Sequence, residues 1–275
     1  NYVRSAAATA AKLGLSCHVQ LENRVDDMPP SYHQSGNVLL HKLFGATSST
    51  FHIGEDEAAA DANIADIAKD FAKKGKKPYL LTLSPDTKPL GALGYIRCAG
   101  EILDQLNNQK QSVEKIVVAS GSAATHVGIL LGLRLLGSEI PVHGICVRRD
   151  RNQQILRVEG IVRLAEHLIG CGKVVQNKDI KCHDDWLAPG YGKTNGLVHE
   201  AMMLAGSLEG MIVDPVYTAK SLAGAIGLYR LGVFNNSQNI LYLHTGGMPA
   251  LFAYEDEITE KLNEGLSIKY QNNKP

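Results

Sequence analysis

Runs of continuous Ile, Val and Leu alternate with amphipathic helical segments along this chain. The clearest runs are Lys115–Ala119 and Val142–Val147, and helices are predicted around them over 91–106 and 125–136. A strand that is apolar at every position must be covered on both faces, which is typical of parallel sheets between helices. The alternation therefore predicts an α/β fold with mainly parallel sheets in three-layer domains.

The same alternation extends toward both ends of the chain, where it is weaker. Alanine-rich and amphipathic stretches indicate helices, and short apolar stretches bounded by glycine or proline indicate strands. We expect helices over 5–13, 37–44, 55–74 and through 161–165, and strands over 17–21, 78–83, 211–213 and 240–243.

The loop Ser84–Pro89 is the predicted boundary between two domains. Its two prolines and polar residues interrupt the alternation where one wound unit ends. We expect a smaller α/β domain over 1–85, incomplete at its N-terminal side, and a larger phosphate-binding α/β domain over 86–275.

The charge balance and the cysteines limit the classes of partner and compartment. The chain has 28 Lys and Arg against 28 Asp and Glu, so no global field attracts nucleic acid or an anionic membrane. The five cysteines form no CxxC pair, which is typical of a reducing compartment. No apolar stretch reaches the ~20 residues of a membrane span, so we expect a cytoplasmic protein that binds small ligands.

Four loops follow predicted strands or precede helices and carry small, aromatic or hydroxyl residues. Ligands of open parallel sheets bind outside the carboxyl ends of the strands, so these loops are where a site is expected. The loop Ser120–Thr125 combines small residues, hydroxyls and a helix N-terminus, which suits a phosphate, although an ordinary turn is an alternative. The other three are Ala188–Gly192, Asp214–Ser221 and His244–Gly247.

Each of those three loops also has a structural interpretation. Tyr191 between two glycines fits a turn as well as a ligand contact, Thr218 fits a helix N-cap, and the glycines after His244 fit a tight turn. The occurrence of all four loops together favours a site for a phosphate-bearing ligand.

Two other enzyme classes fit poorly. The ten histidines are scattered, and His199-Glu200 lacks the second histidine of an HExxH motif because Met203 occupies that position. Ser122 directly follows Gly121, so the Gly-x-Ser-x-Gly motif of serine hydrolases is also absent. No metal is expected.

Taken together, these segments resemble the D-cysteine desulfhydrase and aminocyclopropane-carboxylate deaminase family. Its members are pyridoxal-phosphate enzymes of the tryptophan-synthase-β-like fold (fold type II), and the resemblance implies a homodimer. It runs through nearly the whole chain and rests on Asn1-Tyr2-Val3-Arg4, Gly36 to Leu40, Pro89 to Tyr95, Ser120 to Thr125, Pro189 to Gly192, Asp214 to Tyr217 and His244 to Gly247.

The resemblance also implies roles for individual residues. Tyr217 would lie near the cofactor ring and Tyr191 near the substrate, as the two catalytic residues. Asn1 would contact the ring hydroxyl, and Thr218 and Thr245 would face the pyridine nitrogen. The cofactor phosphate would be bound by Ser120, Gly121, Ser122, Ala123, Ala124 and Thr125.

The identity of residue 218 helps to distinguish between the reactions of this family. Deaminase-like members have a glutamate after the tyrosine, and a carboxylate beside the pyridine nitrogen makes the ring a deeper electron sink than a hydroxyl does. The resemblance therefore implies α,β-elimination, with D-cysteine converted to pyruvate, sulfide and ammonia. Aminocyclopropane-carboxylate deamination, L-cysteate desulfonation and a non-catalytic ligand-binding homologue are the alternatives.

One family motif is absent from this sequence. In the family, the lysine that holds the cofactor belongs to a Gly-Gly-Asn-Lys motif upstream, and a serine directly precedes the asparagine that corresponds to Asn1. Both residues are absent from this sequence. Lys12 and Lys42 lie on predicted helices, and Lys220 fills a non-catalytic place in the tyrosine motif. We therefore expect an N-terminally truncated and inactive form of a working enzyme.

Overall fold

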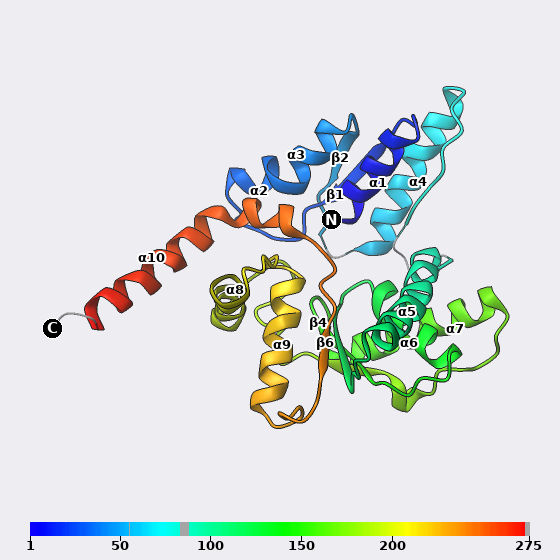
Figure 1. Cartoon of the computed structure of the whole chain (residues 1–275). Helices are drawn as coiled ribbons and strands as arrows, with labels where there is room; N and C mark the ends of the chain where they lie inside the picture. Colours follow the sequence, from blue (N-terminus) through cyan, green and yellow to red (C-terminus); the bar gives the residue numbers. More distant parts are fainter. Residues whose placement is uncertain (55, 83–87, 273–275) are drawn as a thin grey trace.

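The computed structural model describes residues 1–54, 56–82 and 88–272, with side chains described as far as residue 264. Two parallel sheets and the helices around them make up the chain (Figure 1). Within the described ranges, no helix has the length and apolar character needed to cross a membrane.

The larger sheet has four strands in the order β5-β4-β3-β6, all parallel. Ser120 of β3 is paired with Cys146 of β4, and Lys115 of β3 with Ile240 of β6. The strands are β3 (Lys115–Ser120), β4 (Val142–Cys146), β5 (Lys181–His183) and β6 (Ile240–Tyr242).

Helices cover both faces of this sheet because successive residues of a strand point to opposite sides. Ile116 and Val118 of β3 pack against α5 (Leu90–Gln109), α6 (Ala124–Leu135) and α7 (Arg151–Ile169). Val117 packs on the other face, in a cluster with residues of α8 (Gly196–Glu209) and α9 (Thr218–Arg230). The continuous apolar strands are thus explained by burial on two faces.

The first part of the chain holds a smaller sheet, in which β1 (His18–Glu22) and β2 (Thr47–Phe51) are parallel. Its buried apolar cluster is small and centres on Ala7, Val19 and Ala46. The helices of this part are α1 (Tyr2–Lys12), α2 (Pro30–Gln34), α3 (Gly36–Leu43) and α4 (Glu57–Lys73).

The end of the chain returns to this first part. The 3₁₀ segment η2 (Met248–Tyr254) contacts α2 and α3, with the rings of Tyr32 and Tyr254 at 5.6 Å, and α10 (Glu255–Asn272) extends from it (Figure 1). A second 3₁₀ turn, η1 (Asn177–Asp179), precedes β5. The predicted boundary near residue 85 lies within 83–87, outside the described residues, so the two-domain division remains a prediction.

The parallel α/β fold is confirmed, as are β1, β3, β4, β6 and most helices, within one to three residues at each end. Two predicted strands are wrong: 78–82 and 211–213 are not in strands. Tyr79 is 75% exposed, and no described strand pairs with this segment. The segment therefore has neither the burial nor the hydrogen-bonding partner that a strand requires. The strands β2 and β5 were not predicted.

Candidate active site

The strand order places the candidate site between the loops after β3 and β6. Because the four strands are parallel, their final residues lie on one edge of the sheet. The chain runs from β3 to β4 on one side and returns to β6 on the other side of β3. Ligands of open parallel sheets bind outside the carboxyl ends at such a reversal.

The loop Ser120–Thr125 has the backbone of an anion site. Ala123 has φ 77°, a left-handed conformation that is rare for residues other than glycine. It immediately precedes α6, whose first N–H groups have no acceptor within the helix and whose N-terminus carries partial positive charge. This arrangement suits a phosphate.

The side chain of Ser120 faces the core rather than the loop opening. Its hydroxyl accepts a hydrogen bond from Gln154 Nε2 at 2.8 Å and lies 3.1 Å from His126 Nδ1, and Ser120 is fully buried. The predicted contact between Ser120 and a phosphate would therefore come from its main chain.

Two predicted catalytic tyrosines meet beside this loop. The hydroxyl oxygens of Tyr191 and Tyr217 are 2.5 Å apart. A Cβ on Gly121 would lie 3.7 Å from Tyr217 Cε1, so the tyrosine ring is next to the loop. Residues that lie far apart in the sequence, in loops that the sequence analysis treated separately, are thus brought together.

Burial keeps both phenols protonated. It raises the pKa of Tyr191, although the hydrogen bond to Tyr217 and the nearby guanidinium of Arg24 act in the opposite direction. It raises the pKa of Tyr217 well above its ordinary value, and the proximity of Tyr191 adds to the shift. Two neutral phenols need only one proton for their mutual hydrogen bond, which leaves the other available to a ligand.

Asp214 organises the loop before α9. Its fully buried carboxylate accepts hydrogen bonds from the N–H groups of Val216, Tyr217 and Thr218 at 3.0, 3.0 and 2.9 Å. The Thr218 hydroxyl donates to the same carboxylate at 2.7 Å. Thr218 is therefore the first residue of α9 rather than its N-cap, and Asp214 satisfies the N–H groups of the helix start.

The predicted contact residue Asn1 lies at the same place. A Cβ on Gly247 would be 2.5 Å from Asp214 Oδ1 and 2.9 Å from Asn1 Nδ2, and Asn37 Nδ2 donates to Asn1 Oδ1 at 2.7 Å. Thr245, by contrast, is exposed and forms no hydrogen bond with the described residues. The structure brings Asn1, Thr218 and the loop of Gly247 together and leaves Thr245 at the surface.

Lys220 supports the second tyrosine loop. It is fully buried, and its Nζ donates to the carbonyl oxygens of Leu187, at 3.0 Å, and Gly190. Burial lowers its pKa to about 8. These contacts fix the turn that precedes Tyr191.

Arg24, Glu57 and Gln154 lie in this region but have no signal in the sequence, and Asp214 is predicted only as the first residue of its loop. Arg24 lies 6.0 Å from the centre of the Tyr191 ring and pairs with Glu22. The local signal for Asp214 is its place at the start of the loop before Tyr217, since aspartate commonly precedes a helix start. The other three act through contacts that are distant in sequence.

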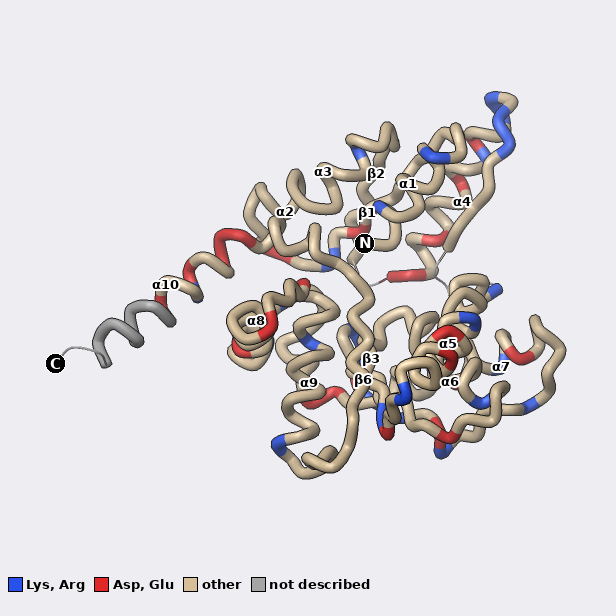
Figure 2. The backbone as a smooth tube through the Cα atoms, in the orientation of Figure 1, with Lys and Arg blue, Asp and Glu red and all other residues tan. Residues whose placement is uncertain are grey.

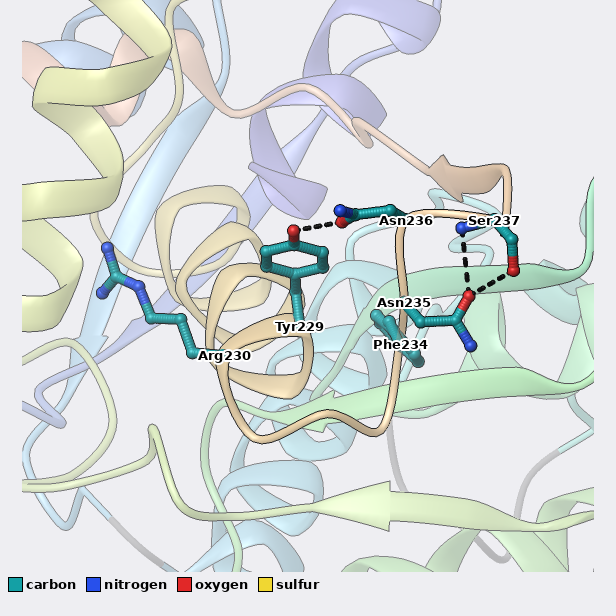
Figure 3. A pocket seen from close by; sticks show the side chains of 6 residues that line it. All are labelled: Tyr229, Arg230, Phe234, Asn235, Asn236 and Ser237. Carbon is teal, nitrogen blue, oxygen red and sulfur yellow. Dashed lines mark hydrogen bonds between the residues drawn. The ribbon is translucent and has the colours of Figure 1, made fainter.

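A separate hollow lies at the amino ends of the strands of the larger sheet, opposite the carboxyl ends where the four loops lie. It measures about 570 Å³ and is lined by Tyr229, Arg230, Phe234, Asn235, Asn236 and Ser237 (Figure 3). These residues lie between α9 and the start of β6, so the hollow is at the amino end of the strands. It is remote from the four loops.

Comparison with known proteins shows the family. Residues 1–246 match the family described as pyridoxal-phosphate dependent enzyme. A D-cysteine desulfhydrase of Salmonella paratyphi A is 38% identical over 258 residues, which is 94% of this chain and 76% of that protein.

Solved structures give the same result. An ACC deaminase homologue superposes with a TM-score of 0.80 at 30% identity, covering 94% of this chain and 74% of the homologue. O-ureido-L-serine synthase superposes with a TM-score of 0.60 at 14% identity, covering 92% and 73% of the two chains, which shows the fold alone.

The two-sheet fold and the loop Ser120–Thr125 before α6 are typical of proteins that hold a phosphorylated cofactor at the carboxyl ends of a parallel sheet. The chain belongs to the pyridoxal-phosphate-dependent enzymes, and within them to the D-cysteine desulfhydrase family.

The residues present fit the phosphate end of this cofactor. The loop Ser120–Thr125 offers main-chain N–H groups at the start of α6, and Gly121 has no side chain to obstruct the space next to Tyr217. Asp214, Thr218 and Gly247 lie at the adjoining loops. The phosphate would be held by the loop of β3, and the ring would face the loops of β6 and α9.

Proposed function

We propose that this protein catalyses α,β-elimination of sulfide from D-cysteine, followed by hydrolysis with one water to pyruvate and ammonia, and that it acts as a homodimer. The observation that carries this proposal is the hydrogen-bonded pair Tyr191–Tyr217 beside the phosphate-binding loop. The 38% identity to a protein named D-cysteine desulfhydrase supports the choice of substrate.

Pyridoxal phosphate, when bound, supplies the electron sink that allows a proton to leave the α-carbon of an amino acid. The chain contributes the binding and orientation. The main-chain N–H groups at the start of α6 bind the phosphate, and the buried carboxylate of Asp214 fixes Tyr217 and Thr218 through their N–H groups.

The tyrosine pair holds a proton close to the substrate. Burial keeps both hydroxyls protonated at neutral pH, so one can donate to the other and the remaining proton can be donated to a leaving sulfur. We assign this donation to Tyr191, with Tyr217 next to the phosphate-binding loop orienting it.

Thr218 favours elimination over ring opening. Its hydroxyl is bonded to Asp214 and stands where the deaminase-like members of the family place a glutamate. A hydroxyl there stabilises charge on the ring less than a carboxylate does, which suffices for elimination of a good leaving group. This supports D-cysteine rather than aminocyclopropane carboxylate.

The substrate is tested with the complete gene product saturated with pyridoxal phosphate. Ammonia and the 2-oxo acid product are assayed with D-cysteine, L-cysteine, aminocyclopropane carboxylate and L-cysteate, and sulfide is assayed with the two cysteines. We expect the largest kcat/KM with D-cysteine. A larger value with aminocyclopropane carboxylate or L-cysteate would replace the proposed substrate, and no turnover of any of them would leave a ligand-binding homologue.

Tyr191→Phe tests the proposed proton donor. The change removes one hydroxyl and keeps the ring, so we expect kcat to fall by roughly 10²-fold or more while KM changes little. Tyr229→Phe, in the hollow at the opposite edge of the sheet, is the matched control and should keep full activity. An unchanged kcat in Tyr191→Phe would remove this residue from the mechanism.

A further inference from the structure

Glu57 lies at the centre of an arginine cluster where the first part of the chain meets the larger sheet. Its carboxylate pairs with Arg149 at 2.9 Å, with Arg157 at 3.0 Å and with Arg148, and Arg24 lies at 3.9 Å. The side chains are mostly buried, with 7% of Arg157 and 22% of Glu57 exposed. The tyrosine mechanism proposed above does not use this cluster.

The partners of Glu57 come from distant parts of the sequence. Glu57 is in the first turn of α4, where Asp56 accepts from Ala59 N at 2.9 Å and fixes the helix start. Arg148 and Arg149 follow β4, and Arg157 is on α7. Figure 2 shows the acidic start of α4 at the junction between the two halves of the molecule.

Two of these arginines also bind the carbonyl oxygens of the phosphate-binding loop. Arg149 Nη1 donates to Gly121 O at 3.3 Å, and Arg157 Nε donates to Ser122 O at 3.2 Å. Gln154 Nε2 also donates to Gly121 O, at 3.2 Å. Each planar guanidinium can hold a carboxylate with one edge and a carbonyl with another.

Holding these carbonyls orients the N–H groups of the loop. In a trans peptide the C=O and the following N–H point in opposite directions. With Gly121 O and Ser122 O directed toward the arginines, the N–H groups of Ser122 and Ala123 point away from them. Those are the groups expected to bind the phosphate.

Glu57 is the counter-charge that keeps the three arginines together. Burial and the neighbouring guanidiniums of Arg157 and Arg148 disfavour the charge on Arg149 and lower its pKa. Burial alone would raise the pKa of Glu57, but Arg148, Arg157 and Arg149 outweigh it and lower that pKa. Loss of the carboxylate charge would let the guanidiniums repel one another and release the loop carbonyls.

We propose that Glu57 is a positioning residue that, through Arg149 and Arg157, fixes the orientation of the phosphate-binding loop and so couples the first part of the chain to cofactor binding. This rests on the proposed function in one respect, since the ligand is a phosphorylated pyridoxal. The coupling between Glu57 and the loop concerns only residues of this chain.

The test compares Glu57→Gln with Glu200→Gln. The second variant also loses one carboxylate charge, but from an exposed pair between Glu200 of α8 and Arg230 of α9. Dissociation constants are measured by equilibrium dialysis for pyridoxal phosphate and for pyridoxal, which lacks the phosphate. Hydrogen exchange of the segment 121–127 is measured without ligand.

We expect Glu57→Gln to weaken pyridoxal phosphate about 10-fold, equivalent to about 1.4 kcal/mol, and to change pyridoxal less than two-fold. Exchange of 121–127 should become faster. Glu200→Gln should leave all three measurements unchanged. Arg149→Lys, which keeps the charge but loses the planar fork, should show the same phosphate-specific loss and serves if Glu57→Gln fails to fold.

Equal weakening of both ligands would mean a general structural effect and would overturn the proposal, as would unchanged exchange in the loop. If the unaltered protein binds pyridoxal phosphate no more tightly than pyridoxal, the phosphate site of the proposed function fails. In that case the exchange measurement still decides whether Glu57 holds the loop.

Discussion

The two sheets of this molecule differ in how they are stabilised. All five residues of β4 are buried, and helices cover both faces of its sheet, whereas β2 has no fully buried residue and, among the described strands, pairs with β1 alone. A two-stranded sheet is marginal in water by itself. The first part of the chain therefore depends on contacts with the rest of the molecule, such as those of Glu57 and η2, while the larger sheet carries its own core.

The largest expected effect is in the core of the larger sheet. Leu131 on α6 is fully buried, and Leu131→Ala removes packing that cannot fully collapse. We expect a loss of about 3–4 kcal/mol in the free energy of unfolding, measured by urea denaturation. Leu135→Ala, at a half-exposed position of the same helix, is the control and should cost much less.

Acid should destabilise the larger sheet through a buried histidine. Burial and the adjacent His183 lower the pKa of His143 to about 3. Folding keeps this ring neutral, so the unfolded chain gains protons first and stability falls as the pH drops from about 6.5 toward 3. We expect a loss of about 2–3 kcal/mol between pH 7 and pH 4 from this group.

His143→Phe isolates that contribution. The variant should lose the part of the pH dependence that His143 supplies, whatever its stability at pH 7.5, where the imidazole is uncharged in both states. Denaturation curves of the two proteins at pH 7.5, 5.5 and 4 provide the comparison. Parallel pH profiles would contradict the prediction.

The junction between the two regions is tested at two adjacent glycines. Gly247 has φ 101°, and an added Cβ would lie 2.5 Å from Asp214 Oδ1, whereas Gly246 has φ 91° and open space around it. Gly247→Ala should therefore cost about 2 kcal/mol and Gly246→Ala about 1 kcal/mol, which is the backbone strain alone. Thermal unfolding of both variants measures the difference, and equal losses would mean that no close contact exists at Gly247.

The smallest effect is expected in the smaller sheet. Val19 is its main buried residue, and Val19→Ala should cost about 1 kcal/mol because the surrounding cluster is small and can relax. Urea denaturation is again the measurement. A loss as large as that of Leu131→Ala would show that the two sheets are equally well packed and would break the comparison.

The sequence predicts the parts of the fold whose signals are local. The strands β3 and β4 are continuous apolar runs, and the glycine, serine and alanine of the loop Ser120–Thr125 lie directly after β3. Thr47–Phe51 is rich in hydroxyl residues, so nothing in its composition distinguishes β2 from a loop. Residues 78–82 have the composition of a strand but no partner strand in the described part of the chain.

The residues of the candidate site also differ in whether a local sequence signal predicts them. Tyr191, Tyr217 and Thr218 are predicted from motifs, but the hydroxyl contact of the two tyrosines depends on how their two loops converge. Glu57 could not be found from its own neighbourhood, because Arg148, Arg149 and Arg157 lie 91 to 100 residues further along the chain. Long-range charge contacts leave no periodic trace in a sequence.

The return of η2 to α2 and α3 limits how this protein can be recombined with its relatives. The last part of the chain is tied to the first, with Gly36 so close to Pro249 that a Cβ would lie 2.4 Å from its carbonyl oxygen. A chimaera with a single crossover near residue 85 would therefore combine a mismatched pair of surfaces. Exchange of the first part as a functional module requires a second crossover near residue 247, so that 248–272 are transferred with it.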